Sequence, residues 1–446
     1  MTEPSAADNK GKWMALLAAF LGWMFDGLEI GLFPIAGRPA LRELLSGRPE
    51  GDVGLWFSGI IACFLIGAAA GGILFGWLGD RIGRVKAMVW SVLCYSIFSG
   101  LCCLVRAPWQ LGALRFIASL GMGGEWALGV SLVSEIWPAK SRPLLSGLIG
   151  AAANVGFLLV GFIGLGLGTF VGGLGSGLRV VLPDAWVEAL LRNNGWRMLF
   201  LVGSVPALLT FFIRIFVPES EKWKSAAGSG PKPKVSDIFA SGLGRTTILG
   251  ACLAGVALMG TWGSVQWVPA WVGSMTIKEH APTWLANMNN AQRVAWTQIF
   301  LAVGSITLAI VIPLLAQKFN RRLAYVGMCA LSLVICEVLF LWKPEFGLTF
   351  LVLATLANGI SAGFYGWLPL YLPELFPTRI RATGSGFCFN IGRVIASAGA
   401  LGGGALHKQV FAGDYAKMCS VVCLIYIAGL IVIWFCPETK GKPLPE

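Results

Sequence analysis

Six ionisable side chains stand inside long apolar stretches of this sequence. A charge far from water is costly, so such a side chain usually faces a polar cavity or a partner of opposite charge. Two of them, Asp26 and Glu29, are three residues apart and would share one face of a helix. The six are Asp26, Glu29, Arg115, Glu125, Glu337 and Arg393.

These groups could take up protons and bind anions. Burial favours the uncharged form of a carboxyl group, so a buried carboxylate can take up a proton near neutral pH. Asp26 and Glu29 would repel each other when ionised, which makes one of them a candidate proton carrier, with Glu125 a weaker candidate. An arginine fork suits a carboxylate, so we expect Arg393, and less strongly Arg115, to bind an anionic substrate. The alternative is a structural network between helices that never takes up a proton.

Aromatic and amide side chains accompany the charges. Trp262, Gln266 and Trp267 stand close together, and a cavity lined by aromatic faces and a few amides would bind a ring or a sugar face. Because Trp is also common at membrane interfaces, an interfacial position is the alternative. The candidates for substrate contact are Arg393, Arg115, Trp262, Gln266, Trp267, Asn358, Tyr365 and Asn390.

The elements that must position these groups are membrane-spanning helices. Of 446 residues, 56% are hydrophobic and only 13% charged, against roughly 25% charged in a soluble domain. The apolar runs have the length of a spanning helix, about 20 residues, which is twice that of a β-barrel strand. The sequence predicts an all-α membrane protein with twelve transmembrane helices. They lie near residues 14–36, 55–78, 86–105, 110–135, 144–168, 197–217, 247–273, 293–316, 323–342, 347–372, 384–406 and 416–436.

The net charge of +12 is a topology signal and makes no case for nucleic acid. With both termini cytoplasmic, 20 of the 34 Lys and Arg residues fall in cytoplasmic loops and tails. Eleven fall in outer loops and three within or beside a span. This asymmetry follows the positive-inside rule. We therefore expect a multi-pass protein of a bacterial-type inner membrane with both termini in the cytoplasm.

A polar stretch at residues 218–245, rich in Gly, Pro, Ser and Lys, is typical of a linker. It separates two halves of six spans each, residues 1–217 and 246–446. Short motifs recur at matching places in the two halves. P-E-S at 218–220 matches P-E-T at 437–439, and Glu135 with Arg142 matches Glu374 with Arg381. The two halves are therefore expected to be pseudo-symmetric repeats.

Two motifs resemble those of the major facilitator superfamily of transporters. G-W-L-G-D-R-I-G-R at residues 76–84 resembles its G-x-x-x-D-R-x-G-R loop. P-E-T-K-G at 437–441 resembles the ending of its sugar and metabolite porters. The resemblance covers the whole chain and implies two six-helix halves that expose a central site to each side of the membrane in turn.

The same resemblance implies a cytoplasmic latch. Gly76, Asp80, Arg81 and Arg84 would hold helix ends together in the outward-open state. Asp80 would sit near the N-terminus of a neighbouring helix, where an anion is favoured, or pair with Arg84 or Arg142. Two analogous brackets are expected, Glu135 with Arg142 and Glu374 with Arg381. By family analogy Glu337 stands in an outer span near lipid.

Within the superfamily, the sequence is similar to the symporters of aromatic acids and related metabolites. D-G-L-E at 26–29, G-M-G-G-E at 121–125 and R-A-T-G-S-G at 381–386 carry that similarity. Glu29 stands where the family pattern has a second Asp. P-E-T-K-G also occurs in sugar porters and organic-ion carriers, so it does not separate these branches.

We therefore predict proton-coupled symport of a small organic anion, such as an aromatic acid, a sugar acid or another carboxylate. A sugar or polyol porter and an organic-cation carrier are the alternatives. A neutral sugar gives no reason to bury Arg115 and Arg393. No P-loop, nucleophile elbow or metal cluster is evident, so no enzyme activity, metal or cofactor is expected. The expected partners are substrate, protons and the bilayer, with the protein as a monomer.

Overall fold

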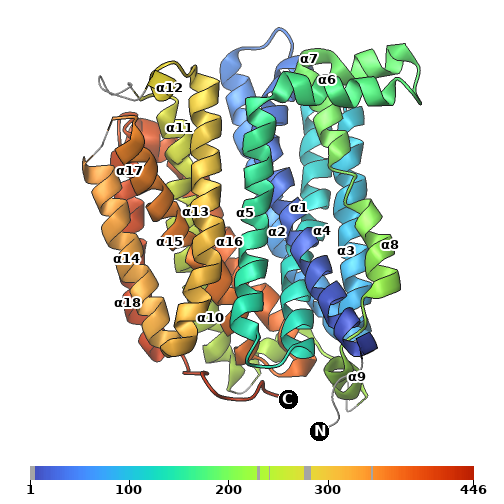
Figure 1. The fold of residues 1–446 in the computed structure, drawn as a ribbon, viewed down its shortest axis with the longest axis vertical. Helices are drawn as coiled ribbons and strands as arrows, with labels where there is room; N and C mark the ends of the chain where they lie inside the picture. The colour runs from blue at the N-terminus through green and yellow to red at the C-terminus, as the bar shows by residue number, and fades with distance from the viewer. Residues whose placement is uncertain (1–5, 229–231, 241, 276–282, 343–344) are drawn as a thin grey trace.

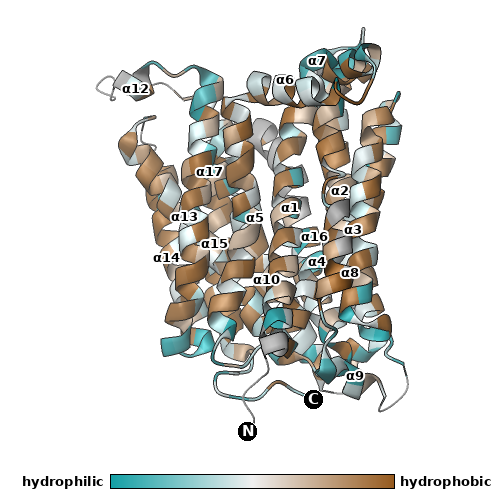
Figure 2. Ribbon diagram, turned by 45° about the vertical axis from the view of Figure 1, so that its right-hand side comes forward, coloured by the Kyte–Doolittle hydropathy of each residue, from teal (hydrophilic) through white to brown (hydrophobic). Residues whose placement is uncertain are grey.

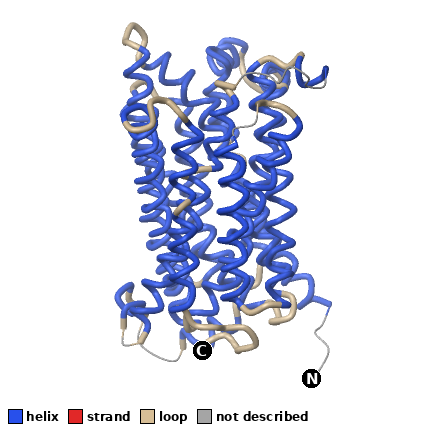
Figure 3. Tube along the Cα trace, turned by 90° about the vertical axis from the view of Figure 1, so that its left-hand side faces the viewer, coloured by secondary structure: helices blue, strands red, loops and turns tan. Residues whose placement is uncertain are grey.

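The computed structural model describes residues 6–228, 232–240, 242–275, 283–342 and 345–446. Across these residues every regular element is an α-helix or a short 3-10 helix, as predicted. The long helices stand side by side in one bundle (Figure 1), and the view of Figure 3 shows the same arrangement from the side. Both chain ends lie at the lower end of the bundle in Figure 1. We refer to it as the terminus end, and to the other as the distal end.

The first half of the chain forms five long helices, a pair of elements at the distal end and a short eighth helix. Their bounds are α1 Ala6–Leu44, α2 Glu50–Ile82, α3 Arg84–Leu101, α4 Pro108–Ile136, α5 Arg142–Leu165, α6 Leu167–Leu178, α7 Asp184–Val202 and α8 Ala207–Phe216. The chain then passes beneath the bundle through α9, Glu221–Ala227, and a 3-10 turn at Val235–Phe239.

The second half repeats the arrangement with more breaks. Its bounds are α10 Leu243–Trp262, α11 Val268–Val272, α12 Thr283–Ala286, α13 Asn290–Lys318, α14 Arg321–Trp342, α15 Leu348–Tyr371, α16 Arg381–Gln409, α17 Tyr415–Cys423 and α18 Ile425–Val432. A 3-10 turn at Leu372–Leu375 and another at Thr378–Ile380 join α15 to α16. α10 begins inside the stretch expected to be linker, after Gly242, whose φ of +91° is the left-handed conformation that glycine tolerates.

Ten stretches of the described residues are long and apolar enough to cross a membrane, and they match ten of the twelve expected spans. The sixth span is broken at residues 203–206, because Pro206 has no N–H to continue the helix of α7 into α8. The eleventh, α16, has 29 residues but carries Arg381, Arg393 and many small residues, which lowers its hydropathy. These two helices complete the twelve-helix arrangement.

The outer face of the bundle is apolar. In Figure 2 hydrophobic residues cover the middle of the helices, and hydrophilic residues gather at the two ends. Large apolar side chains point outward along this band, among them Trp90, Ile215 and Leu331 with 60%, 69% and 55% exposure. Such a continuous exposed apolar surface is compatible with lipid and not with water.

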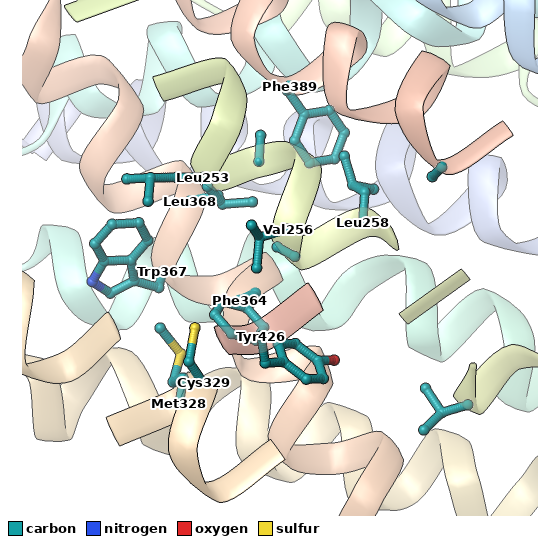
Figure 4. Close-up of a cluster of buried hydrophobic side chains, with 14 of the residues drawn as sticks. Leu253, Val256, Leu258, Met328, Cys329, Phe364, Trp367, Leu368, Phe389 and Tyr426 are labelled. Atoms are coloured by element: carbon teal, nitrogen blue, oxygen red, sulfur yellow. The ribbon is translucent and has the colours of Figure 1, made fainter. Parts of the chain in front are cut away.

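Aromatic packing holds the second half together. Trp367 on α15 lies 4.8 Å from Tyr325 on α14 and stacks on Tyr371 at 4.5 Å between ring centroids. Figure 4 shows Trp367 beside Leu253 and Leu368, with Phe364 and Tyr426 below Val256. The helices α10, α14, α15 and α18 therefore share one tightly filled core.

Small residues let helices of the first half approach closely. A Cβ at Gly71 on α2 would collide with the backbone of Leu120 on α4, and one at Gly123 on α4 would collide with that of Ala68. Close approach of this kind drives helix association in lipid. The small-residue spacing in these two spans is therefore explained by packing.

Two glycines of α2 give a matched test of this packing. We expect Gly71→Ala to destabilise the protein by about 1–3 kcal/mol, because the backbone of α4 must move. Gly59→Ala is the control, since nothing lies within 4 Å of the position of its Cβ and Ala gains up to about 1 kcal/mol in helix propensity. The measurement is the thermal unfolding temperature of each purified variant in detergent. Equal temperatures for the two variants would contradict the packing role.

Candidate functional site

A cavity of about 190 Å³ lies in the middle of the bundle, between the two halves. For comparison, an apolar cavity of roughly 150 Å³ can hold benzene. Helices α1, α2, α4 and α5 form one wall, and α10, α15 and α16 form the other. Its lining is mainly apolar, with the charged and amide side chains of Asp26, Arg115, Asn154, Gln266 and Arg393. The cavity therefore suits one small organic molecule with a few polar groups.

Arg393 supplies the positive charge of the second-half wall and is only 7% exposed. Its Nη1 donates to Asn390 Oδ1 at 3.1 Å. Its guanidinium carbon lies 5.1 Å from the ring centre of Phe389 and 5.5 Å from that of Trp23. In the part of the chain that the structure describes, no carboxylate forms a salt bridge with it. Its remaining N–H donors are available to an anion in the cavity.

Arg115 is paired instead. Its Nη1 lies 2.5 Å from Glu29 Oε1, and Ser99 Oγ donates to the same carboxylate oxygen. The guanidinium lies between the rings of Phe33 and Phe64, 4.7 Å and 4.6 Å from their centres. Arg115 reaches the cavity lining but Glu29 does not. This buried ion pair joins α1 to α4 and leaves no net charge.

Asp26 and Glu125 form a second kind of pair. Both are buried, at 0% and 5% exposure, and the two carboxyl groups lie close enough to act on each other electrostatically. Neither accepts a hydrogen bond from any described residue. Glycine at position 22 makes room for the pair, since a Cβ there would lie 2.8 Å from Glu125 Oε2. Two neighbouring carboxylates repel each other, and a proton on one of them removes that repulsion.

Only some of the residues predicted to contact substrate line the cavity. Trp262, Gln266 and Tyr365 line the cavity, and Tyr365 Oη lies 2.6 Å from Thr261 Oγ1. Trp267 lies outside the lining, with its ring 6.0 Å from that of Tyr415.

The two predicted asparagines lie behind the cavity wall. Asn358 on α15 donates to Leu301 O and Ser305 Oγ on α13, so it joins two helices of the second half. Asn390 orients Arg393 through its Oδ1, while its Nδ2 donates to Gly386 O at 2.8 Å. Glu337, at the outer side, accepts from Ser420 Oγ at 2.5 Å.

Sequence reasoning missed most of the lining, including Trp23, Phe389 and Asn154. Phe389 stacks on Trp126 at 3.9 Å between ring centroids and forms the floor beneath Arg393. Phenylalanine in a long apolar run carries no signal of its own. Asn154 could have been found, because it is the single amide of α5.

At the terminus end, the expected latch residue Asp80 caps the N-terminus of α16. Its carboxylate accepts from Ala382 N at 3.3 Å, Thr383 N at 2.8 Å and Thr383 Oγ1, and it lies 2.5 Å from Arg84 Nη1. Gly76 packs against the same helix start, since a Cβ there would lie 2.7 Å from Ala382 O. The two halves are thus joined where α2 meets α16.

Arg81 takes no part in this network. It is exposed and lies over the ring of Trp77, 4.7 Å from its centre.

The predicted brackets are wrong in their pairing, because the arginines reach across to the other half. Glu135 binds Arg84 Nη2 at 2.9 Å and Arg381 Nη1 at 3.1 Å, and makes no bracket with Arg142. Glu374 binds Arg321 at 2.8 Å, and Arg142 of the first half faces it across a crevice. The motif spacing identified the residues, but only the packing of the two halves decides their partners.

The glutamates of the repeated P-E-S and P-E-T motifs each cap the start of a helix in their own half. Glu219 accepts from the N–H groups of Arg84 and Val85 at 3.0 and 3.1 Å, at the start of α3. Glu438 accepts from those of Arg321 and Arg322 at 3.0 and 3.2 Å, at the start of α14. Each carboxylate satisfies N–H groups that the first helical turn leaves free. The contacts of the two motifs are therefore related as a repeat.

The twelve-helix bundle with a central cavity defines the chain as a multi-pass membrane transporter of small molecules. Residues 13–400 match the Major Facilitator Superfamily, and the chain belongs to it. This membership accounts for the absence of any enzyme signature in the sequence.

Curated relatives cover nearly the whole chain. A cis,cis-muconate transport protein of Acinetobacter baylyi is 29% identical, over 93% of this chain and 94% of its own. A probable 4-methylmuconolactone transporter of Cupriavidus pinatubonensis is 28% identical, over 95% of this chain and 90% of its own. Among solved structures, a proton:xylose symporter superposes with a TM-score of 0.73 at 17% identity, over 98% of both chains, which supports the fold.

The pair of Glu29 and Arg115 yields a stability prediction. Arg115→Met leaves a buried carboxylate without its cation, which we expect to cost about 3–5 kcal/mol. The double variant Glu29→Met/Arg115→Met removes both charges and should recover most of that loss. Thermal unfolding of the two variants beside the wild type measures the difference. A double variant as unstable as the single one would show that the ion pair itself matters little.

Proposed function

We propose that this protein is a proton-coupled symporter of a small organic anion, such as an unsaturated or aromatic carboxylate. The observation that carries the proposal is Arg393: a buried cation at the cavity wall, flanked by two aromatic rings, with no carboxylate partner among the described residues. A carboxylate placed there would receive charge-assisted hydrogen bonds from the guanidinium. The apolar remainder of the cavity would cover a flat carbon skeleton.

The proton site of this proposal is the pair of Asp26 and Glu125. Asp26 lines the cavity that Arg393 also lines, and the positive charge of Arg393 acts on it. An arriving anion would weaken that attraction and make a further proton on the pair more favourable. Substrate and proton would therefore bind together. Glu29, held by Arg115 and Ser99, is the weaker candidate for proton transfer.

The relatives support an anionic substrate. Muconate, named for the Acinetobacter baylyi protein, is a small unsaturated dicarboxylate. The sugar alternative has support from the fold of the xylose symporter and from the aromatic lining, Trp262 and Tyr365. A neutral sugar, however, leaves the charge of Arg393 uncompensated, and an organic cation would be repelled by it.

The proposal includes a location for the protein and its orientation in the membrane. Both termini would face the cytoplasm of a bacterial-type inner membrane, in line with the excess of Lys and Arg at that end. The Asp80 and Glu135 networks would then close the cytoplasmic side, and the two halves, residues 1–217 and 246–446, would move as units about the linker at 218–245. The protein would act as a monomer.

Uptake by proteoliposomes tests the anion site. With an inside-alkaline pH gradient, we expect accumulation of a radiolabelled carboxylate from a panel that also holds sugars and quaternary amines. Arg393→Gln should lower kcat/KM by about 10- to 100-fold, the loss of a charged hydrogen bond. Arg192→Gln, a change at an exposed arginine, is the control. Transport of a sugar that ignores Arg393→Gln would favour the sugar-porter alternative.

A second experiment separates proton coupling from substrate binding. Asp26→Asn keeps the size of the side chain but cannot carry the proton, so uphill uptake driven by the pH gradient should be lost. Exchange of internal for external substrate needs no net proton movement and should persist. Both fluxes are measured in the same vesicles. Intact gradient-driven accumulation in Asp26→Asn would remove Asp26 from the coupling role.

A further inference from the structure

The last residues of the chain lie inside the seam between the two halves. Leu444 is only 7% exposed. It lines a narrow crevice at the terminus end, together with Val130 and Val133 of α4 and Pro369 and Pro373 of the second half. Only about 10 Å³ remains free around it. Leu444 therefore lies at a crevice that residues of both halves line.

Polar contacts hold the segment in place beside this leucine. The carbonyl oxygen of Pro445 accepts from Arg381 Nη2 at 2.7 Å and from Thr378 N at 3.2 Å. Arg381 in turn reaches Glu135 of the first half through its Nη1 at 3.1 Å. The carbonyl oxygen of Pro445 is thus one of the hydrogen-bond acceptors of Arg381, the arginine that joins the two halves.

These contacts are separate from the repeated capping motif. Glu438 caps the start of α14, and Thr439 donates a hydrogen bond to Glu374. In the first half, the residues after the matching P-E-S motif continue into α9, outside the crevice. The seam contacts of residues 444–445 are therefore not required by the repeat.

We propose that residues 444–446 are an autoinhibitory latch that holds the terminus end sealed. Opening this end must separate α4 and α5 from the end of α15 and the 3-10 turn at Leu372–Leu375, since those elements form the crevice. Leu444 would then lose one apolar wall, and the Pro445 carbonyl would lose an arginine positioned by Glu135. The tail must leave the seam before the cavity can open to this side, which rests on the alternating exposure assumed in the proposed function.

The test measures exposure of the seam without any substrate or pH gradient. Ser146, which is buried and lines the same crevice as Leu444, is replaced by cysteine in the full chain. Its alkylation by a water-soluble maleimide is followed by mass spectrometry of the peptide that contains it. We expect Leu444→Ala, and deletion of residues 444–446, to raise the labelling rate of position 146 about tenfold, the effect of losing most of a buried leucine.

Two controls make the result specific. Lys442→Ala changes an exposed residue of the same tail and should leave the rate unchanged. Native Cys102, which is fully buried away from the seam, should stay unlabelled in all variants. Unchanged labelling of position 146 in both tail variants would overturn the proposal, as would an equal rise in Lys442→Ala or at Cys102. Failure of anion transport, by contrast, would not alter this readout.

Discussion

The cost of a charge away from water governs this structure. Within an apolar bundle, each buried charge needs a partner, a shared proton or a cavity. Arg115 has Glu29, Asp26 and Glu125 have each other, and Arg393 has the cavity. The helix positions follow, because α1 must bring its two acidic residues against α4 while α16 brings its arginine to the opposite wall.

The same constraint explains how the two halves differ at the terminus end. At the terminus end, Asp80, Arg84 and Glu135 are completely or almost completely buried and bonded to each other and to α16. The second half has Gln317 where the first has Asp80. Within the described residues, the side chain of Gln317 makes only a 3.5 Å contact with Lys140 O. The repeat therefore supplies matching helix caps. Among the described residues, however, the buried carboxylates that bind across the halves, Asp80 and Glu135, both belong to the first half, and their partners in the second half lie on α16.

The sequence predicted the all-α fold and the repeat. It also identified most of the charged residues within the spans, because a charge in an apolar run is rare and easily recognised. It further predicted that Asp80 would lie at a helix N-terminus or pair with Arg84 or Arg142, and the structure has it at the start of α16 and beside Arg84. The ion pairs between the two halves could not be predicted. Glu135 binds Arg381 because of the way α4 packs against α16, and the spacing of residues in the sequence does not encode this packing. Trp23 and Phe389 were missed because an aromatic residue in a span looks the same in a wall as in a core.

The balance of charges around the cavity gives a reason for an anion and a proton to be transported together. Glu29 and Arg115 cancel. If Asp26 and Glu125 share one proton, their charge of minus one is balanced by Arg393, and the empty site is neutral. A bound monocarboxylate makes it negative by one charge, and a second proton on the acid pair restores neutrality. Because closing a charged cavity within the membrane is costly, the fully loaded and fully empty states are the ones that can reorient. On the proposed mechanism, this favours one proton for each monovalent anion.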